Sequence, residues 1–95
     1  FIKNYIVIMI VSASILAADF TKLGEECERA LANGADWIHL DVMDGQFVSQ
    51  LTMGPQFVRA LRQRLGPDAY LDCHLMVVDP KRWVGEFALA GASSV

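Results

Sequence analysis

Apolar and polar residues alternate along the chain with two different periods. Three short segments, 11–16, 36–43 and 69–77, have the apolar content and alternation typical of strands. Between and after them, apolar residues recur at the three- and four-residue spacing of one helix face. We therefore predict the order strand, helix, strand, helix, strand, helix, with residues 92–95 opening a fourth strand.

Capping residues mark the ends of the three predicted helices. Asp19 suits an N-cap, and Pro55 and Pro80 each suit the first turn of a helix. Glycines at positions 34, 66 and 91 allow the left-handed conformation that ends many helices. The apolar residues expected to face inward are Phe20, Leu23, Cys27, Ala30 and Leu31 in the first helix, Phe57, Val58, Leu61 and Leu65 in the second, and Trp83, Val84, Phe87 and Ala88 in the third.

This alternation predicts an α/β fold. Strands that alternate with helices at this spacing form right-handed βαβ units around a parallel sheet. The 95 residues are enough for one small domain, so we expect 1–95 to be a single domain. The chain has neither a GxGxxG pattern nor a Walker loop, so the sequence does not support nucleotide binding.

The N-terminal run leaves two interpretations open. An uncharged stretch from Asn4 to Ala18 follows Lys3, which is typical of a signal peptide. A buried parallel strand also reads as a continuous apolar run. The run is too short to predict a membrane span, so composition alone does not decide between the two.

Charge and cysteine content narrow the class of protein. The formal net charge is −3 and there is no basic stripe, which argues against a nucleic-acid partner. Cys27 and Cys73 lie far apart without a CxxC spacing. This favours reduced thiols in a cytoplasmic protein over a disulfide framework, and Cys27 is expected to pack as a small apolar residue.

Polar residues occupy one face of each predicted strand. Because side chains alternate along a strand, His39, Asp41 and Met43 share a face, opposite Ile38 and its neighbours. Two other sets share a face in the same way: Asp72, His74 and Met76 in the third strand, and Ser12, Ser14 and Leu16 in the first. These residues approach the C-terminal ends of parallel strands, where α/β folds bind ligands.

Two histidines and an aspartate from neighbouring strands predict a divalent metal site. Imidazole and carboxylate suit Zn²⁺, Fe²⁺ or Mn²⁺, and a cation offsets the cost of a buried carboxylate. The alternative is that His39 and His74 are hydrogen-bonded core residues and Asp41 caps a turn. Asp72 either orients the His74 imidazole or makes a structural hydrogen bond.

Four segments together resemble the ribulose-phosphate 3-epimerase family. They are "SILAADF" (14–20), "GADWIHLDVMDG" (34–45), "LTMGP" (51–55) and "LDCHLMVVDP" (71–80), in the family's order and spacing. The similarity runs from about Ser12 to the end of the chain. It also favours a strand over a signal peptide, since "SASIL" matches the family's first barrel strand.

The resemblance implies an isomerase of the pentose phosphate pathway with a (β/α)₈ barrel. The 95 residues would form about its first three βα units, the N-terminal portion of a ribulose-phosphate-binding TIM barrel. Such an enzyme interconverts D-ribulose 5-phosphate and D-xylulose 5-phosphate with one divalent metal ion (Zn, Fe, Mn or Co). A homo-oligomer of the full-length protein is also expected, with no membrane partner.

The resemblance also assigns roles to individual residues. His39, Asp41 and His74 match metal ligands, and Asp41 also matches the proton acceptor. Ser14 and His74 match residues that contact the substrate. Met43 and Met76 match methionines that line the reaction intermediate.

The match has gaps and departures. The family's second catalytic aspartate and its phosphate site match nothing in these residues, so we expect the 95 residues alone to be inactive. Ala13 replaces a proline, and Gln46, Ser49 and Gln50 depart from the usual loop. Two alternatives to the epimerase stay open. One is a non-catalytic fragment or partner-binding paralogue, and the other is a 3-epimerase of another ketose phosphate.

Overall fold

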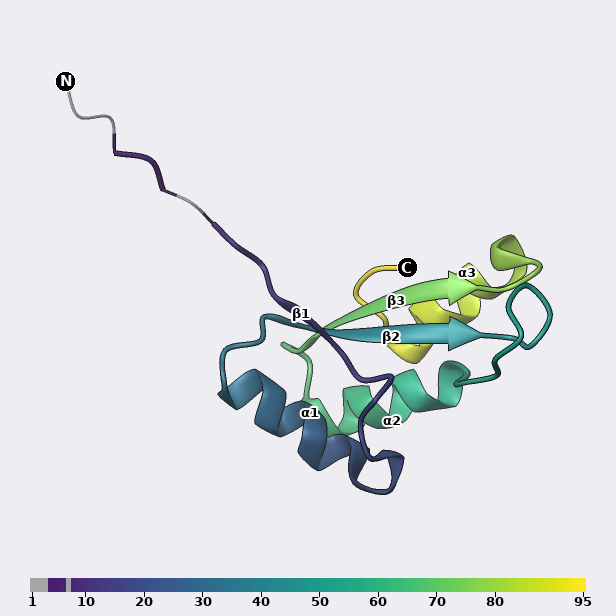
Figure 1. Ribbon diagram of the computed structural model, residues 1–95, viewed down its shortest axis with the longest axis horizontal. Coiled ribbons are helices and arrows are strands. Elements are labelled where there is room, and N and C mark those ends of the chain that lie inside the picture. The colour runs from purple at the N-terminus through teal and green to yellow at the C-terminus, as the bar shows by residue number, and fades with distance from the viewer. Residues whose placement is uncertain (1–3, 7) are drawn as a thin grey trace.

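A computed structural model describes residues 4–6 and 8–95, and its elements follow the predicted order (Figure 1). The strands are β1 (Ser12–Ser14), β2 (Trp37–Met43) and β3 (Tyr70–Met76). The helices are the short 3-10 helix η1 (Phe20–Lys22), α1 (Leu23–Ala32), α2 (Pro55–Leu65) and α3 (Pro80–Ala90). Asp19 caps η1 rather than α1, because its carboxylate accepts from the Thr21 N–H.

The strands form one parallel sheet in the order β1-β2-β3. Asp41 pairs with His74 across β2 and β3, and Ser14 pairs with His39 across β1 and β2. Ser94 forms an isolated parallel bridge with Asp72, so a fourth strand begins where it was predicted. The α/β prediction is therefore confirmed, with the strands and helices of the first three βα units of a barrel.

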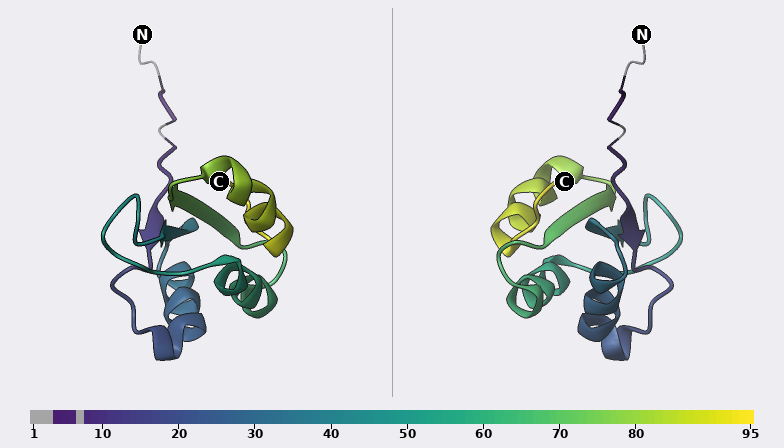
Figure 2. Two further views of the ribbon diagram at one scale, coloured as in Figure 1. Left: turned by 90° about the vertical axis from the view of Figure 1, so that its right-hand side faces the viewer. Right: turned by 90° about the vertical axis from the view of Figure 1, so that its left-hand side faces the viewer.

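All three α-helices cover one face of the sheet (Figure 2). The strand residues on that face are buried, with Ile38, Leu40 and Leu71 fully inaccessible to solvent. The alternate residues of β2 are only half-buried, as the predicted parity requires. Both cysteines are free and buried, which confirms the packing role expected of Cys27.

The prediction for the third helix is wrong at two positions. Val84 and Ala88 are exposed, while Trp83 and Phe87 pack on the core together with Ala90. Residues 84 and 88 follow their buried neighbours by one position each. That places them about 100° further round the helix, away from the sheet.

The N-terminal run is not a buried strand along its length. Regular pairing covers only Ser12–Ser14, although Ile15 N–H still donates to the His39 carbonyl at 3.1 Å. Tyr5, Ile6 and residues 8–11 are exposed, and positions 5, 6 and 8–10 extend away from the sheet (Figure 1). Within the part of the chain that the structure describes, no other element covers positions 5, 6 and 8–10, so this part of the apolar run does not form a buried strand. Among the described residues, no helix is long and apolar enough to cross a membrane.

Arg62 ties the C-terminal ends of α2 and α3 together. Its guanidinium donates to the carbonyls of Gly91 (2.7 Å), Gly66 (2.8 Å) and Ala69 (2.6 Å), and to Ser93 Oγ (3.0 Å). Gly91 has φ 114°, and a Cβ there would lie 2.9 Å from Arg62 Cγ. Glycine therefore serves both the left-handed turn and the close approach of the arginine.

Candidate metal centre

The face of the sheet opposite the helices carries the polar cluster. His39 and Asp41 project from β2, and His74 projects from β3 beside Asp41. Each offers one ligand atom, and these atoms all lie within 4.8 Å of one another. The predicted convergence of these three side chains is confirmed, because parallel pairing brings two strands into register at this point.

Two of the distances within the cluster are close to those between ligands of one small cation. His39 Nε2 lies 3.2 Å from Asp41 Oδ1, and His74 Nδ1 lies 3.7 Å from the same oxygen. Ligands bonded at about 2.0–2.2 Å to a four-coordinate ion lie roughly 3.3–3.6 Å apart. An imidazole lone pair and a carboxylate oxygen also repel unless a proton or a cation lies between them. The donor set therefore fits a divalent metal.

Of the two roles left open for Asp72, the orientation of His74 is not what the structure shows, because the carboxylate contacts His39. Its Oδ2 lies 2.8 Å from His39 Nδ1, so it orients His39 and not His74. The reason is the register: Asp72 is the direct partner of His39 across the parallel pair. His74 is two residues away along the same strand, about 6.6 Å at the usual rise of a strand.

Ser14 and Asp41 are joined by a hydrogen bond that the sequence did not reveal. Ser14 Oγ donates to Asp41 Oδ2 at 2.8 Å, and the Leu16 N–H donates to Ser14 Oγ at 3.3 Å. The two carboxylate oxygens of Asp41 therefore have separate surroundings. Oδ1 faces the histidines and Oδ2 faces Ser14.

Met43 and Met76 are direct partners at the C-terminal ends of β2 and β3. Both side chains are half-buried and follow Asp41 and His74 on the same face. They form an apolar margin beside the polar cluster. Their predicted contact with a reaction intermediate stays a prediction.

The pKa values of the Asp72 carboxyl group and the Cys73 thiol are shifted in opposite directions. Partial burial raises the pKa of Asp72, but hydrogen bonds from Ser94 and His39 outweigh it and leave that pKa below its usual range. Burial, reinforced by the Asp72 charge, raises the pKa of Cys73 to about 11. Cys73 is therefore a neutral thiol at physiological pH and a poor nucleophile or metal ligand.

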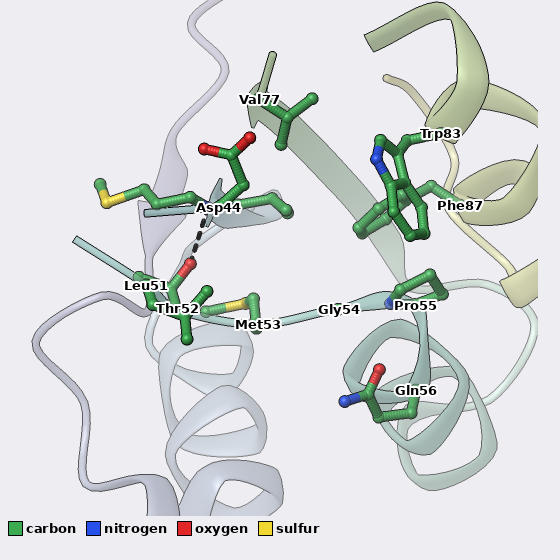
Figure 3. Close-up of a pocket in the computed structure, with 12 residues that line it drawn as sticks. Asp44, Leu51, Thr52, Met53, Gly54, Pro55, Gln56, Val77, Trp83 and Phe87 are labelled. Carbon is green, nitrogen blue, oxygen red and sulfur yellow. Dashed lines mark hydrogen bonds between the residues drawn. The ribbon is translucent and has the colours of Figure 1, made fainter. Parts of the chain in front are cut away.

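A cavity of about 300 Å³ lies on the other side of the sheet, and the sequence did not predict it (Figure 3). Trp83 and Phe87 of α3, Gln56 of α2 and Thr52 of the preceding loop line it. Thr52 Oγ1 is already paired, donating to the Asp41 carbonyl at 2.6 Å and accepting from the Met43 N–H at 2.9 Å. None of His39, Asp41 and His74 lines this cavity, whereas Met43, which borders the polar cluster, does.

The amino-acid sequence matches known epimerases. The model of the ribulose-phosphate 3 epimerase family matches residues 10–95. A Candida glabrata ribulose-phosphate 3-epimerase is 44% identical over 97 residues, covering 87% of this chain and 39% of that protein. A cytoplasmic isoform from Oryza sativa is 47% identical (87% of this chain, 36% of that protein). A chloroplastic ribulose-5-phosphate-3-epimerase from Arabidopsis thaliana is 52% identical (92% and 30%). The chain spans about two fifths of the length of the first of these.

Proposed function

Because the chain belongs to the ribulose-phosphate 3-epimerase family, we propose that it is the N-terminal portion, residues 1–95, of a TIM-barrel enzyme that epimerises a ketopentose phosphate at C3. The substrate pair is D-ribulose 5-phosphate and D-xylulose 5-phosphate. The observation that carries the proposal is the grouping of His39, Asp41 and His74 on the open face of the sheet. The matched relatives, named for this activity, support the same assignment.

We assign His39, Asp41 and His74 to one divalent metal ion, which when bound would stabilise negative charge developing on a substrate oxygen. His39 would bind through Nε2, because Nδ1 faces the Asp72 carboxylate at 2.8 Å. A carboxylate partner on the second ring nitrogen is the usual support for a ligating histidine. His74, exposed and next to Asp41, is free to contact substrate as well.

Asp41 is assigned the first proton transfer. The C3 hydrogen lies next to the C2 carbonyl, so its removal gives an enediolate rather than a localised carbanion. Asp41 takes the proton, the C–H electron pair becomes the new C2–C3 double bond, and the π pair of the C2 carbonyl moves onto its oxygen. Return of a proton to the opposite side inverts C3, and we propose that a second acid, which corresponds to none of these residues, delivers it.

Other residues on this face are assigned to binding and shielding. Ser14, whose hydroxyl donates to Asp41 Oδ2 at 2.8 Å, is proposed to contact the substrate as well. Met43 and Met76 line the apolar side of the planar intermediate. Water readily protonates an enediolate on either face, so apolar side chains that exclude water preserve the stereochemistry of the product.

The remaining partners follow from the same assignment. The substrate is a sugar phosphate, and the full-length protein is proposed to be a homo-oligomer in the cytoplasm. Two free, buried cysteines are in keeping with a reducing compartment. The names of the relatives include both a cytoplasmic and a chloroplastic isoform.

The test is exchange of the C3 hydrogen of ribulose 5-phosphate with solvent deuterium in the intact protein. Asp41→Asn keeps the shape of the side chain but removes the base. General-base catalysis contributes about 10²–10⁴-fold, so exchange should slow by at least that factor. Metal content is measured in parallel. Near wild-type exchange in a metal-loaded Asp41→Asn protein would show that Asp41 is only a ligand.

A further inference from the structure

We infer that Ser94 is a positioning residue for the metal ligand His39, acting through Asp72. The inference rests on the proposed metal site and extends it beyond the three ligands. It concerns a residue from the beginning of the fourth strand, which touches neither histidine. The relevant contacts form a chain from Ser94 through Asp72 to His39.

Each oxygen of the Asp72 carboxylate has its own partner. Ser94 Oγ donates to Oδ1 at 2.6 Å, and His39 Nδ1 lies 2.8 Å from Oδ2. With both oxygens engaged, the carboxylate cannot rotate without breaking a short hydrogen bond. Its plane, and the direction in which it receives the imidazole N–H, are therefore fixed from two sides.

The backbone places Ser94 firmly for this task. The Cys73 N–H donates to the Ser94 carbonyl at 2.9 Å, and the Ser94 N–H donates to the Leu71 carbonyl at 3.2 Å. These bonds on either side of Asp72 form a parallel bridge between residues 72 and 94. The hydroxyl of Ser94 thus projects toward the same face as the Asp72 carboxylate.

The preceding serine, Ser93, provides a contrast within the same segment. Its hydroxyl accepts from the Leu71 N–H at 3.0 Å and from Arg62 Nη2 at 3.0 Å. Those partners belong to the backbone of β3 and to the helix side of the molecule. Ser93 therefore supports the fold, whereas Ser94 supports Asp72.

Metal binding through Nε2 requires the proton of a neutral His39 ring to sit on Nδ1. Both ring nitrogens face a carboxylate, Nδ1 at 2.8 Å from Asp72 Oδ2 and Nε2 at 3.2 Å from Asp41 Oδ1. With a metal on Nε2, Nδ1 would donate to Asp72, because a carboxylate only accepts hydrogen bonds. Without the Ser94 hydroxyl, Asp72 gains a free oxygen and rotational freedom. The ring of His39 is then held less firmly in its ligating orientation.

The test compares the intact wild-type protein with Ser94→Ala, Ser94→Thr and the matched control Ser93→Ala. The first readout is the Zn²⁺ dissociation constant from competition with a chelator. Loss of a direct partner of a ligating histidine typically costs about 10–100-fold in affinity. Asp72→Ala should fall in that range, and Ser94→Ala, one step further out, should weaken binding about threefold to tenfold.

The second readout is the Nδ1 proton resonance of His39 in ¹⁵N-labelled protein, both Zn²⁺-loaded and metal-free. A short hydrogen bond to a carboxylate moves this proton downfield. Ser94→Ala should shift it upfield, and Ser94→Thr, which keeps the hydroxyl, should restore both the shift and the affinity. Ser93→Ala should lower the melting temperature but change neither readout.

The outcomes separate this inference from the proposed function. If Ser94→Ala matches the wild type in both readouts, or matches Ser93→Ala, the inference is overturned whatever the enzymatic activity. If the intact protein lacks epimerase activity while Ser94→Ala shifts the His39 resonance, the proposed function fails and the positioning role stands. If Zn²⁺ does not bind, the metal site fails and the inference, which rests on it, fails too.

Discussion

The two faces of β2 and β3 differ although they share one backbone. On the helix side, Leu40 and Leu71 are fully buried among other apolar side chains. On the open side, alternate residues are half-buried or exposed and hydrogen-bond to one another from Ser94 through Asp72 and His39 to Asp41 and Ser14. One face thus holds the sheet to its helices, and the other concentrates polar groups in a single line.

The two faces contribute differently to the free energy of folding. Apolar burial stabilises the fold by about 25 cal/mol per Å² removed from water. Charged groups lose hydration when partly buried and recover it only through well-placed partners. No buried side-chain polar atom within the described residues lacks a hydrogen bond. A line of satisfied polar groups in place of apolar ones points to a chemical role rather than a stabilising one.

The largest expected effect on stability comes from the helix side. Leu40→Ala removes a fully buried side chain next to Asp41 in sequence but opposite to it in space. It should lower the free energy of unfolding of the intact protein by about 2–5 kcal/mol. Denaturant unfolding measures the loss, and C3 exchange per folded molecule should stay close to wild type. A large loss of exchange in fully folded Leu40→Ala would break the division between the faces.

Arg62 should give the next largest effect. Arg62→Met keeps much of the apolar stem but removes the hydrogen bonds to four carbonyls and Ser93 Oγ. Unsatisfied carbonyls and lost charged hydrogen bonds should cost about 1–3 kcal/mol of unfolding free energy. Arg59→Met, at an exposed position of α2, is the matched control and should change little. Equal unfolding curves for the two variants would show that the Arg62 contacts do not stabilise the protein.

The smallest expected effect is a pH dependence from Asp44. The Val78 N–H, together with those of Gln46 and Phe47, holds the pKa of Asp44 below its usual range. A carboxylate whose pKa is lowered on folding stabilises the folded protein at pH values above the pKa of the unfolded state. This contribution is lost as the pH falls through the pKa of the folded state. Asp44→Asn should therefore flatten the loss of stability below about pH 4. Parallel acid-unfolding curves for variant and wild type would contradict this.

Periodicity and helix caps predicted most of the fold. The alternation of Ile38 and Leu40 with His39 and Asp41 placed two faces correctly, because the side-chain period of a strand is fixed by its backbone. The glycines and prolines at helix ends predicted where the helices begin and end. The prediction for Val84 was wrong because the side of α3 that faces the sheet depends on how the helix packs. The spacing of apolar residues alone does not determine this to within one position.

The grouping of the three candidate ligands could be predicted from the sequence, but their hydrogen-bond partners could not. Strand alternation and the family resemblance together predicted that His39, Asp41 and His74 lie close to one another. The role of Asp72 stayed open between orienting His74 and a structural hydrogen bond, because its partner depends on strand register, and register is a tertiary property. The Ser94 contact depends on a fourth strand that only just begins, so no local pattern could have revealed it.

The most direct test of the metal centre is anomalous diffraction from crystals of the intact protein grown with Zn²⁺. We expect one strong anomalous peak, from a Zn²⁺ ion bonded at about 2.0–2.2 Å to His39 Nε2, Asp41 Oδ1 and a nitrogen of His74. His39 Nδ1 should keep its contact with Asp72 Oδ2, which is 2.8 Å long in this structure. An anomalous map with Zn²⁺ bound elsewhere, and with His39 Nε2 still directly hydrogen-bonded to Asp41, would contradict it.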